Sequence, residues 1–196
     1  MNQREQQREE TRDRIVAAAV ECFAERGFRA ASTREIATRA GTNQGLITYH
    51  FRSKDDLWKA AADRIFGLLR SAIAELAPTL EPLDPRERAR EGIRQFVRFA
   101  AAHPELFRFM LEEGKNDDER LQWLIDHHLR PLYDVLPEFG DAASGPLRPH
   151  LRYILVGAGS VIFAVAPECR RLTGLDPTQP EAIETHANVL ARLLVP

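Results

Sequence analysis

Helix-start and helix-stop signals alternate closely within residues 32–54, and this spacing constrains the fold more than any other feature of the chain. Ser32 with Glu35 is a capping-box pattern, in which each side chain accepts a hydrogen bond from a free backbone N–H. Gly41 ends this helix, because glycine readily adopts the left-handed conformation that a helix C-terminus often needs. Asn43 can cap the next helix. The pattern predicts two short helices joined by a tight turn.

The second of these helices has two chemically different sides. Ile47 and Phe51 give it an apolar side that can be buried. The other side carries hydrogen-bonding residues, namely Gln44, Thr48, Tyr49 and His50. Ser53 with Asp56 then opens a third helix with another capping pattern. Two short helices at a steep angle, the second lined with hydrogen-bonding groups, are typical of a helix-turn-helix unit that enters the DNA major groove.

Basic residues are concentrated at the same end of the chain. Between residues 26 and 54 there are six basic side chains and one acid, which gives 6 − 1 = +5. Residues 1–54 carry 10 basic and 7 acidic groups, or +3, and the whole chain is −2, so residues 55–196 must carry −5. A whole-chain pI near 6.3 alone argues against nucleic acid. The segregation instead joins a basic end that can meet phosphates to an acidic body.

Several spaced motifs make residues 11–60 similar to the DNA-binding domain of the TetR family of bacterial transcriptional regulators. The first helix ends Phe-Ala-Glu-Arg-Gly-Phe at residues 23–28, and Thr-Arg-Glu-Ile-Ala follows at residues 33–37. Ala-Gly at residues 40–41 and Tyr-His-Phe at residues 49–51, with Ser-Lys at 53–54, complete the resemblance. Leu46 and Thr48 depart from the commonest family pattern. Both lie on the predicted recognition helix, so they affect which operator sequence is read.

The resemblance implies a set of DNA-contacting residues, and their chemistry agrees with it. Arg34 and Lys54 suit phosphates or guanine edges, and Gln44 can pair with a base edge. Tyr49 and His50 can donate to phosphate oxygens, which fixes position without reading sequence. The alternative is an ordinary solvated helix face. The full predicted set is Thr33, Arg34, Gln44, Gly45, Leu46, Thr48, Tyr49, His50 and Lys54.

Helical periodicity continues through the rest of the chain, and no segment shows sustained period-2 alternation. We therefore expect an all-α, nine-helix TetR-like architecture. Residues 1–53 form the predicted helix-turn-helix head, and residues 54–196 form a helical ligand-binding and dimerisation body. Residues 78–85 contain three prolines and are the clearest linker. The expected helices span about 7–26, 33–40, 44–51, 54–77 (halting before Pro78), 85–103, 105–113, 117 onward with a kink at Pro131, 151–165 and 180–194, with a loop at about 137–147.

Aromatic and large apolar residues in the body are candidates for an effector cavity, although such residues usually form packed core. Trp123 and His127 are four residues apart and share a helix face, which places a polar tip beside an apolar wall. His127 and His128 do not suggest a metal site, because adjacent helix positions point about 100° apart. We expect no metal and no cofactor. The cavity candidates are Phe96, Phe99, Phe107, Met110, Trp123, His127 and Phe163.

The last two predicted helices are candidates for a homodimer interface. Small residues around Gly159 permit close helix approach, and the final helix has apolar residues at helical spacing. Four helices from two subunits would form the four-helix bundle that the resemblance implies. The alternative is that the small residues pack inside one subunit. The interface candidates are Leu155, Gly159, Ile162, Ile183, Ala187, Leu190 and Leu194.

The sequence thus predicts a cytoplasmic homodimeric repressor that binds double-stranded DNA at an inverted-repeat operator. A small, largely apolar effector would release it. The N-terminus has no signal-peptide pattern, and no apolar run approaches the roughly 20 residues of a membrane span. No catalytic motif is present, so we expect no enzymatic activity. The alternatives are a small-molecule carrier or enzyme with a vestigial head, or a ligand-independent architectural DNA-binding protein.

Overall fold

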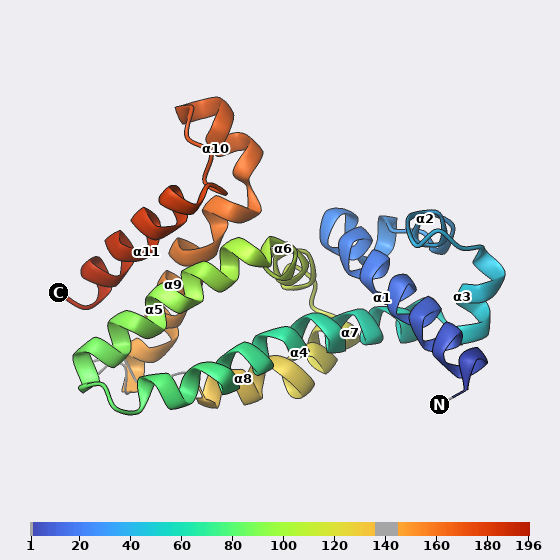
Figure 1. Ribbon diagram of the computed structural model, residues 1–196, viewed down its shortest axis with the longest axis horizontal. Helices are drawn as coiled ribbons and strands as arrows, with labels where there is room; N and C mark the ends of the chain where they lie inside the picture. Colours follow the sequence, from blue (N-terminus) through green and yellow to red (C-terminus); the bar gives the residue numbers. More distant parts are fainter. Residues whose placement is uncertain (1, 136–144) are drawn as a thin grey trace. The chain divides into compact units, whose positions relative to one another are not determined.

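The computed structural model describes residues 2–135 and 145–196, and every regular element within them is helical (Figure 1). The predicted all-α class is confirmed. A π-helical turn, Ile125–Leu129, joins α7 to α8, so these segments form one helix. The nine expected helices are then present, and α10 is an additional short helix. The helices are α1 (Gln3–Ala30), α2 (Thr33–Arg39), α3 (Gln44–His50), α4 (Lys54–Leu80), α5 (Pro85–Ala102), α6 (Pro104–Glu113), α7 (Glu119–Leu124), α8 (Arg130–Val135), α9 (Arg148–Ala164), α10 (Ala166–Thr173) and α11 (Pro180–Leu194).

The chain divides into two compact units. The N-terminal unit contains Met1–Leu68 and Arg108–Pro131, and the C-terminal unit contains Leu69–Phe107 and Leu132–Pro196. The N-terminal unit therefore includes α1 to α3, the first half of α4, and a later piece of chain that contains α7. A domain boundary between residues 53 and 54 remains a proposal.

Two glycines end α1 and α2 through positive φ angles. Gly27 has φ +68° and interrupts α1 near its end, where the sequence predicts the stop. Gly41 has φ +62°, and its N–H donates to the Thr38 carbonyl while the Thr42 N–H donates to the Ala37 carbonyl. These two bonds form a Schellman motif, which satisfies the last carbonyls of α2. They fix the tight turn between α2 and α3.

Side-chain caps then start the helices of this region. Ser32 Oγ accepts from the Glu35 N–H at 3.1 Å, and Asn43 Oδ1 accepts from the Leu46 N–H at 3.1 Å. The Glu35 carboxylate does not complete the expected capping box. It pairs with the guanidinium groups of Arg26 and Arg39, each at 3.1 Å, because these cations are stronger partners than a backbone amide.

The helix α4 is longer than the sequence predicts, since it passes Pro78 and ends at Leu80. A proline in the last turn removes only one intrahelical donor, so the helix tolerates it there. Arg88 of α5 then donates to the carbonyls of Leu80, Glu81 and Leu83 at 2.9–3.1 Å. The linker is thus shortened to a turn of four residues, 81–84, and one guanidinium group binds two of its carbonyls, those of Glu81 and Leu83.

The helix is not kinked at Pro131 as the sequence predicts. The deviation lies before it, in the π-helical turn Ile125–Leu129, and α8 continues through the proline. A widened turn is a common way to absorb an irregularity in the helical hydrogen-bond ladder. Most of the loop expected at about 137–147 lies outside the described residues. Its last three residues, Gly145–Leu147, are described and form a short 3₁₀ turn.

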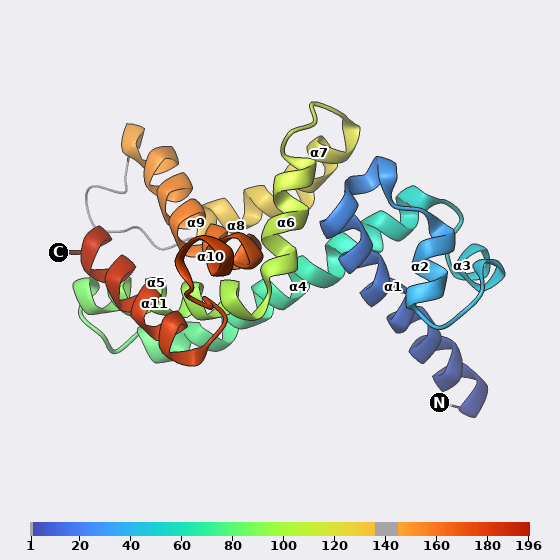
Figure 2. The ribbon, with the colours of Figure 1, turned by 90° about the horizontal axis from the view of Figure 1, so that it is seen from above.

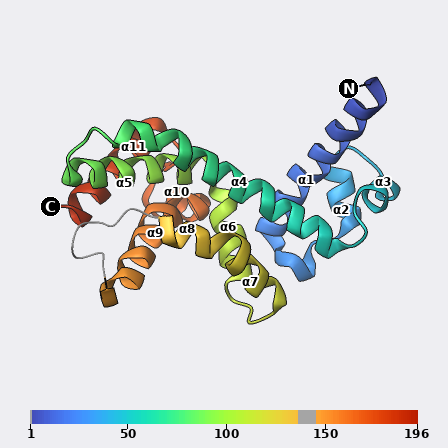
Figure 3. The ribbon, with the colours of Figure 1, turned by 90° about the horizontal axis from the view of Figure 1, so that it is seen from below.

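The core of the C-terminal unit is formed by α5, α9 and α11, which lie side by side (Figures 2 and 3). Asp84 caps α5 by accepting from the N–H groups of Arg86 and Glu87. Ile93 and Val97 of α5 are fully buried. Within the described residues no single helix is long and apolar enough to cross a membrane. Among these residues only the pair α9 and α10 reaches that length and apolar composition, and the two helices are bent by 74° at their junction.

Candidate DNA-binding surface

The helix α3 buries one side and exposes the other. Ile47 is 3% exposed, and Phe51 at its C-cap is 6% exposed, so this side anchors the helix to the N-terminal unit. The exposed residues of α3 are Gln44, Gly45, Leu46, Thr48 and Tyr49. This is the side on which the sequence places the base-contacting groups.

Contacts between α2 and α3 hold part of the predicted set in place. The Gln44 side-chain amide donates to Thr33 Oγ1 at 3.1 Å, which links the first residues of the two helices. Thr33 is half-buried, and Arg34 beside it is exposed. The carboxamide oxygen of Gln44 stays available, so this side chain enters any DNA contact from an already restricted position.

Lys54 has a different environment from the free phosphate contact that the sequence suggests. Its ammonium donates to the Arg29 carbonyl at 3.4 Å and lies 4.6 Å from the centre of the Phe28 ring. Burial, and secondarily the nearby Arg120 guanidinium, lower the pKa of Lys54. Without DNA, Lys54 therefore binds the C-terminal end of α1.

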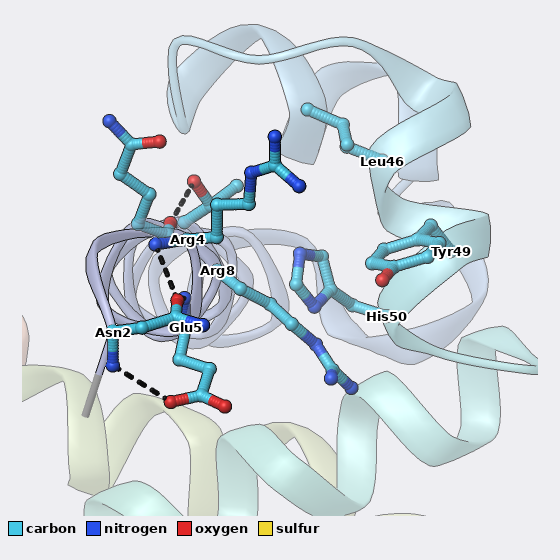
Figure 4. Close-up of a pocket in the computed structure, with 9 residues that line it drawn as sticks. Asn2, Arg4, Glu5, Arg8, Leu46, Tyr49 and His50 are labelled. Atoms are coloured by element: carbon cyan, nitrogen blue, oxygen red, sulfur yellow. Dashed lines mark hydrogen bonds between the residues drawn. The ribbon is translucent and has the colours of Figure 1, made fainter.

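Tyr49 and His50 line a groove of about 400 Å³ between α3 and the first three turns of α1 (Figure 4). Tyr49 is 66% exposed, and His50 is half-buried with its ring edge-on to Tyr49. Burial, followed by the charges of Arg8 and Arg12, lowers the pKa of His50, although Glu9 opposes the shift. His50 is therefore neutral at pH 7, so it can donate one N–H but carries no charge to a phosphate.

Three arginines of α1 were missed by the sequence analysis. Arg4, Arg8 and Arg12 recur at i, i+4 and i+8 and so share one helix face. The Arg8 guanidinium lies 5.7 Å from the Tyr49 ring centre, and that of Arg12 lies 5.5 Å from the Phe51 ring centre. The spacing of four residues predicts a basic helix face, but the acidic residues between these arginines cancel their charge when the net charge of the segment is counted.

A buried polar cluster supports the same unit. Trp58 of α4 is fully buried, stacks on Phe109 and donates its indole N–H to Glu113 Oε1 at 3.2 Å. Glu113 is 1% exposed, and its other oxygen lies 3.6 Å from Arg120 Nε. The Arg120 guanidinium lies 4.0 Å from the Phe28 ring centre at the end of α1. This chain of contacts ties α1, α4, α6 and α7 together.

We expect Glu113→Gln to flatten the dependence of thermal stability on pH. Burial raises the pKa of Glu113 above its ordinary value of 4.5. The folded protein therefore holds this proton more tightly than the unfolded chain, so the stability that it contributes is present below pH 4.5 and is lost as pH rises through the folded pKa. The melting temperature of the variant relative to wild type should rise from pH 4.5 towards neutrality. Parallel melting curves for the two proteins would contradict this.

The seven cavity candidates fall into two groups, one in each compact unit. In the C-terminal unit, Phe96 and Phe107 meet edge-on at 5.7 Å, and Phe163 is buried. Phe99 lies in this unit, and Met110, Trp123 and His127 belong to the N-terminal unit.

The histidine pair points apart, as the sequence predicts. His127 is exposed, stacks on Trp123 at 4.4 Å and bonds the Trp123 carbonyl, so both belong to the same helix surface. His128 is 2% exposed, stacks on Phe66 and lies 3.1 Å from an Asp63 carboxylate oxygen. The packing of Trp123 against Trp58 at 5.6 Å favours its core interpretation.

The interface candidates on α9 and α11 lie at different depths within the protomer. Four of them are buried inside the protomer, namely Leu155, Gly159, Ala187 and Leu190. The exposed fractions of Leu155, Ala187 and Leu190 are 0–5%. A Cβ at Gly159 would lie 2.6 Å from the Phe96 ring, so the glycine admits α5 of its own subunit. The alternative that small residues pack internally therefore applies to these positions. The remaining candidates, Ile162, Ile183 and Leu194, are half-buried.

The outward faces of the same two helices carry a different apolar surface. On α9, Ile154 and Val161 are 50% and 43% exposed, and Val165 at its C-cap is 41% exposed. On α11, Val189 and Leu193 are 49% and 71% exposed. His186 Nε2 and the Ala158 carbonyl oxygen lie 2.7 Å apart, which joins the two faces. We call this the α9–α11 outer face, and it consists of Ile154, Ala158, Val161, Val165, Ala182, His186, Val189 and Leu193.

The capped α2–turn–α3 arrangement with its exposed polar face defines a helix-turn-helix protein. The family description "bacterial regulatory proteins, tetR family" matches residues 15–61. The chain is also 33% identical over 150 residues to the HTH-type transcriptional activator FasR of Mycolicibacterium smegmatis, covering 76% of this chain and 68% of that protein. The chain therefore belongs to the TetR family of bacterial regulators, which confirms the predicted resemblance.

Other similar proteins extend this comparison. Over 111 residues the chain is 33% identical to the HTH-type transcriptional repressor NicS of Pseudomonas putida, a match that spans 57% of this chain and about half (51%) of that protein. FadR of Bacillus halodurans, a fatty acid degradation regulator, has a TM-score of 0.69 at 19% identity over 94% of each chain. FadR of Bacillus subtilis, solved with stearoyl-CoA, has a TM-score of 0.65 at 19% identity over 93% of this chain and 97% of that one. These two structures share the fold.

Proposed function

We propose that this protein is a homodimeric repressor that binds an inverted-repeat operator in double-stranded DNA and is released by a small-molecule effector. The observation that carries the proposal is the exposed, hydrogen-bonding side of α3, held rigidly by the Asn43 cap and by the Gln44–Thr33 bond. Its predicted contacts are those of the DNA-binding set given above. We assign DNA binding without catalysis as its activity, and we place the protein in the cytoplasm, where the DNA lies.

The dimer supplies the second DNA-reading head. One recognition helix makes few contacts, whereas two heads related by a two-fold axis read both halves of an inverted repeat. We propose the α9–α11 outer face as the dimer surface, because it is apolar and faces away from α5. It lies on the same two helices as the interface residues that the sequence predicts.

The effector is proposed to be largely apolar and to bind the helical body, within residues 54–196. A FadR structure of the same fold contains stearoyl-CoA, an amphipathic molecule with a long acyl chain. The aromatic candidates of the C-terminal unit, among them Phe96, Phe107 and Phe163, are the residues that we assign to it. A thermal-shift series with acyl-CoA and fatty acids of increasing chain length tests the class. Equal melting temperatures throughout the series would reject it.

The operator-binding proposal is tested with duplex DNA from the region upstream of the gene and with random DNA of equal length. We expect Gln44→Ala to lose about 1–3 kcal/mol on the operator and little on random DNA, because a base contact carries specificity. Lys54→Ala should weaken binding to both DNAs and reduce the slope of log affinity against log salt by about one unit per head. Fluorescence anisotropy at several salt concentrations measures both effects.

Lys59→Ala is the matched control, since Lys59 lies on the same helix and pairs with Asp55 at 2.8 Å. It should leave both affinities near wild type. Equal losses on operator and random DNA for Gln44→Ala would contradict a reading role for this residue. Wild-type binding that ignores sequence would favour an architectural DNA-binding protein, and absence of DNA binding would favour the carrier or enzyme with a vestigial head.

A further inference from the structure

The first turns of α1 present arginines that pair with no acid among the residues that the structure describes. Within the described part of the chain, the side chains of Arg4, Arg8 and Arg12 form no ion pair, in contrast to Arg26 and Arg39, which bind Glu35. An arginine that is already paired has little to offer an external anion. These three keep their guanidinium donors available.

This end of α1 is an ordered helix. Asn2 Oδ1 accepts from the N–H groups of Arg4 and Glu5 at 2.9 and 3.0 Å, and Glu5 Oε2 accepts from the Asn2 N–H at 2.9 Å. This reciprocal capping box also occupies the Glu5 carboxylate, which lines the groove and would otherwise compete for a nearby guanidinium. The arginines are thus displayed at fixed positions on a helix face.

The same face borders the recognition helix. Arg4 and Arg8 line one wall of the groove of about 400 Å³, and Leu46, Tyr49 and His50 of α3 line the other (Figure 4). The Arg8 guanidinium stands over the Tyr49 ring, which holds the cation at the mouth of the groove beside an exposed phenol. Two guanidinium groups and the Tyr49 hydroxyl thus border one open groove beside α3, the proposed recognition helix (Figure 4).

We propose that this groove holds a sugar-phosphate strand bordering the major groove that α3 enters, with Arg4, Arg8 and the Tyr49 hydroxyl donating to its phosphates. Arg4 and Arg8 are separated by about 6 Å along the helix axis, so they can serve different phosphates of one strand. Guanidinium groups suit phosphate oxygens because they offer planar, paired donors. The inference rests on the proposed DNA binding and adds a second contact element to it.

The test compares Arg8→Gln and Arg4→Gln with wild type on operator and random DNA. In a dimer each substitution removes two phosphate contacts, so the slope of log affinity against log salt should fall by about two units. At 0.15 M salt this corresponds to a roughly 30-fold loss on both DNAs. Arg64→Gln, an exposed arginine of α4 in the same unit, is the charge-matched control and should bind like wild type. Melting temperatures of all variants check that the fold is retained.

Phosphate ethylation interference on the operator locates the contacts. Arg8→Gln should abolish interference at phosphates that flank the bases affected by Gln44→Ala. If wild type binds DNA but Arg4→Gln and Arg8→Gln leave the salt slope unchanged, the groove is not a strand contact, whereas failure of wild type to bind any DNA overturns the proposed function itself. Inorganic phosphate is titrated without DNA as the other source of this anion. Millimolar affinity or better that disappears in Arg8→Gln, together with an unchanged salt slope of that variant on DNA, would overturn the strand assignment and identify a free-anion site.

Discussion

A double substitution on the α9–α11 outer face, Val161→Glu with Leu193→Glu, is expected to give a folded monomer. Val161 and Leu193 are 43% and 71% exposed in the protomer, so neither charge disturbs its core. In a dimer the four carboxylates would be buried in an apolar interface, which is strongly unfavourable without partners. Sedimentation velocity should show the change of mass.

Loss of the dimer should cost far more DNA affinity than loss of one contact. Two linked heads bind with an avidity that commonly exceeds that of one head by 10²–10⁴, so we expect operator affinity to fall at least about 100-fold. Leu111→Glu is the control, because Leu111 is 51% exposed but lies on α6. A charge at Leu190 is not a useful test, since that residue is 5% exposed and its substitution would unfold the protomer. A double variant that sediments as a dimer would move the interface elsewhere.

Trp58→Ala is expected to be the most destabilising single substitution in the N-terminal unit. The indole is fully buried between Phe109 and Trp123, so its removal leaves a large cavity that costs about 3–5 kcal/mol. It also leaves the buried Glu113 without its indole donor, which adds about 1–3 kcal/mol. Urea unfolding followed by circular dichroism measures the sum.

Trp58→Phe separates the two contributions. It keeps an aromatic ring against Phe109 and removes the N–H donor, so we expect a loss of about 1–3 kcal/mol. Operator binding by Trp58→Ala should weaken together with its stability, because the cluster ties α4 to the end of α1. A loss below about 2 kcal/mol for the alanine variant would show that the surrounding helices collapse into the space.

Short-range signals in the sequence predict most of the head correctly, because caps and turns depend on residues that are close along the chain. Ser32, Gly41 and Asn43 each act where the pattern places them. The additional helix α10 was not predicted, because it follows α9 after a single residue and no loop in the sequence separates the two helices.

Packing between helices that are far apart in the sequence could not be predicted from such short-range signals. Gly159 and Leu190 have the composition of a helix–helix interface, but the sequence does not say whether the partner helix belongs to the same chain. The Phe96 ring decides it, because it occupies the space that Gly159 leaves open. The groove beside α3 is a similar case. Its arginines come from α1, and only folding brings Arg8 to Tyr49.

The burial of Lys54 beside Arg120 has a consequence for proton exchange. In the free protein its pKa is lowered by burial and by Arg120, so part of the population loses its proton at alkaline pH. A phosphate would restore the charged form, so DNA association through Lys54 must be accompanied by proton uptake in that range. Binding heats measured in buffers of different ionisation enthalpy would then diverge at high pH, and operator affinity would fall there. Burial of the Lys54 ammonium beside Arg120 is thus expected to make the proposed DNA binding sensitive to alkaline pH.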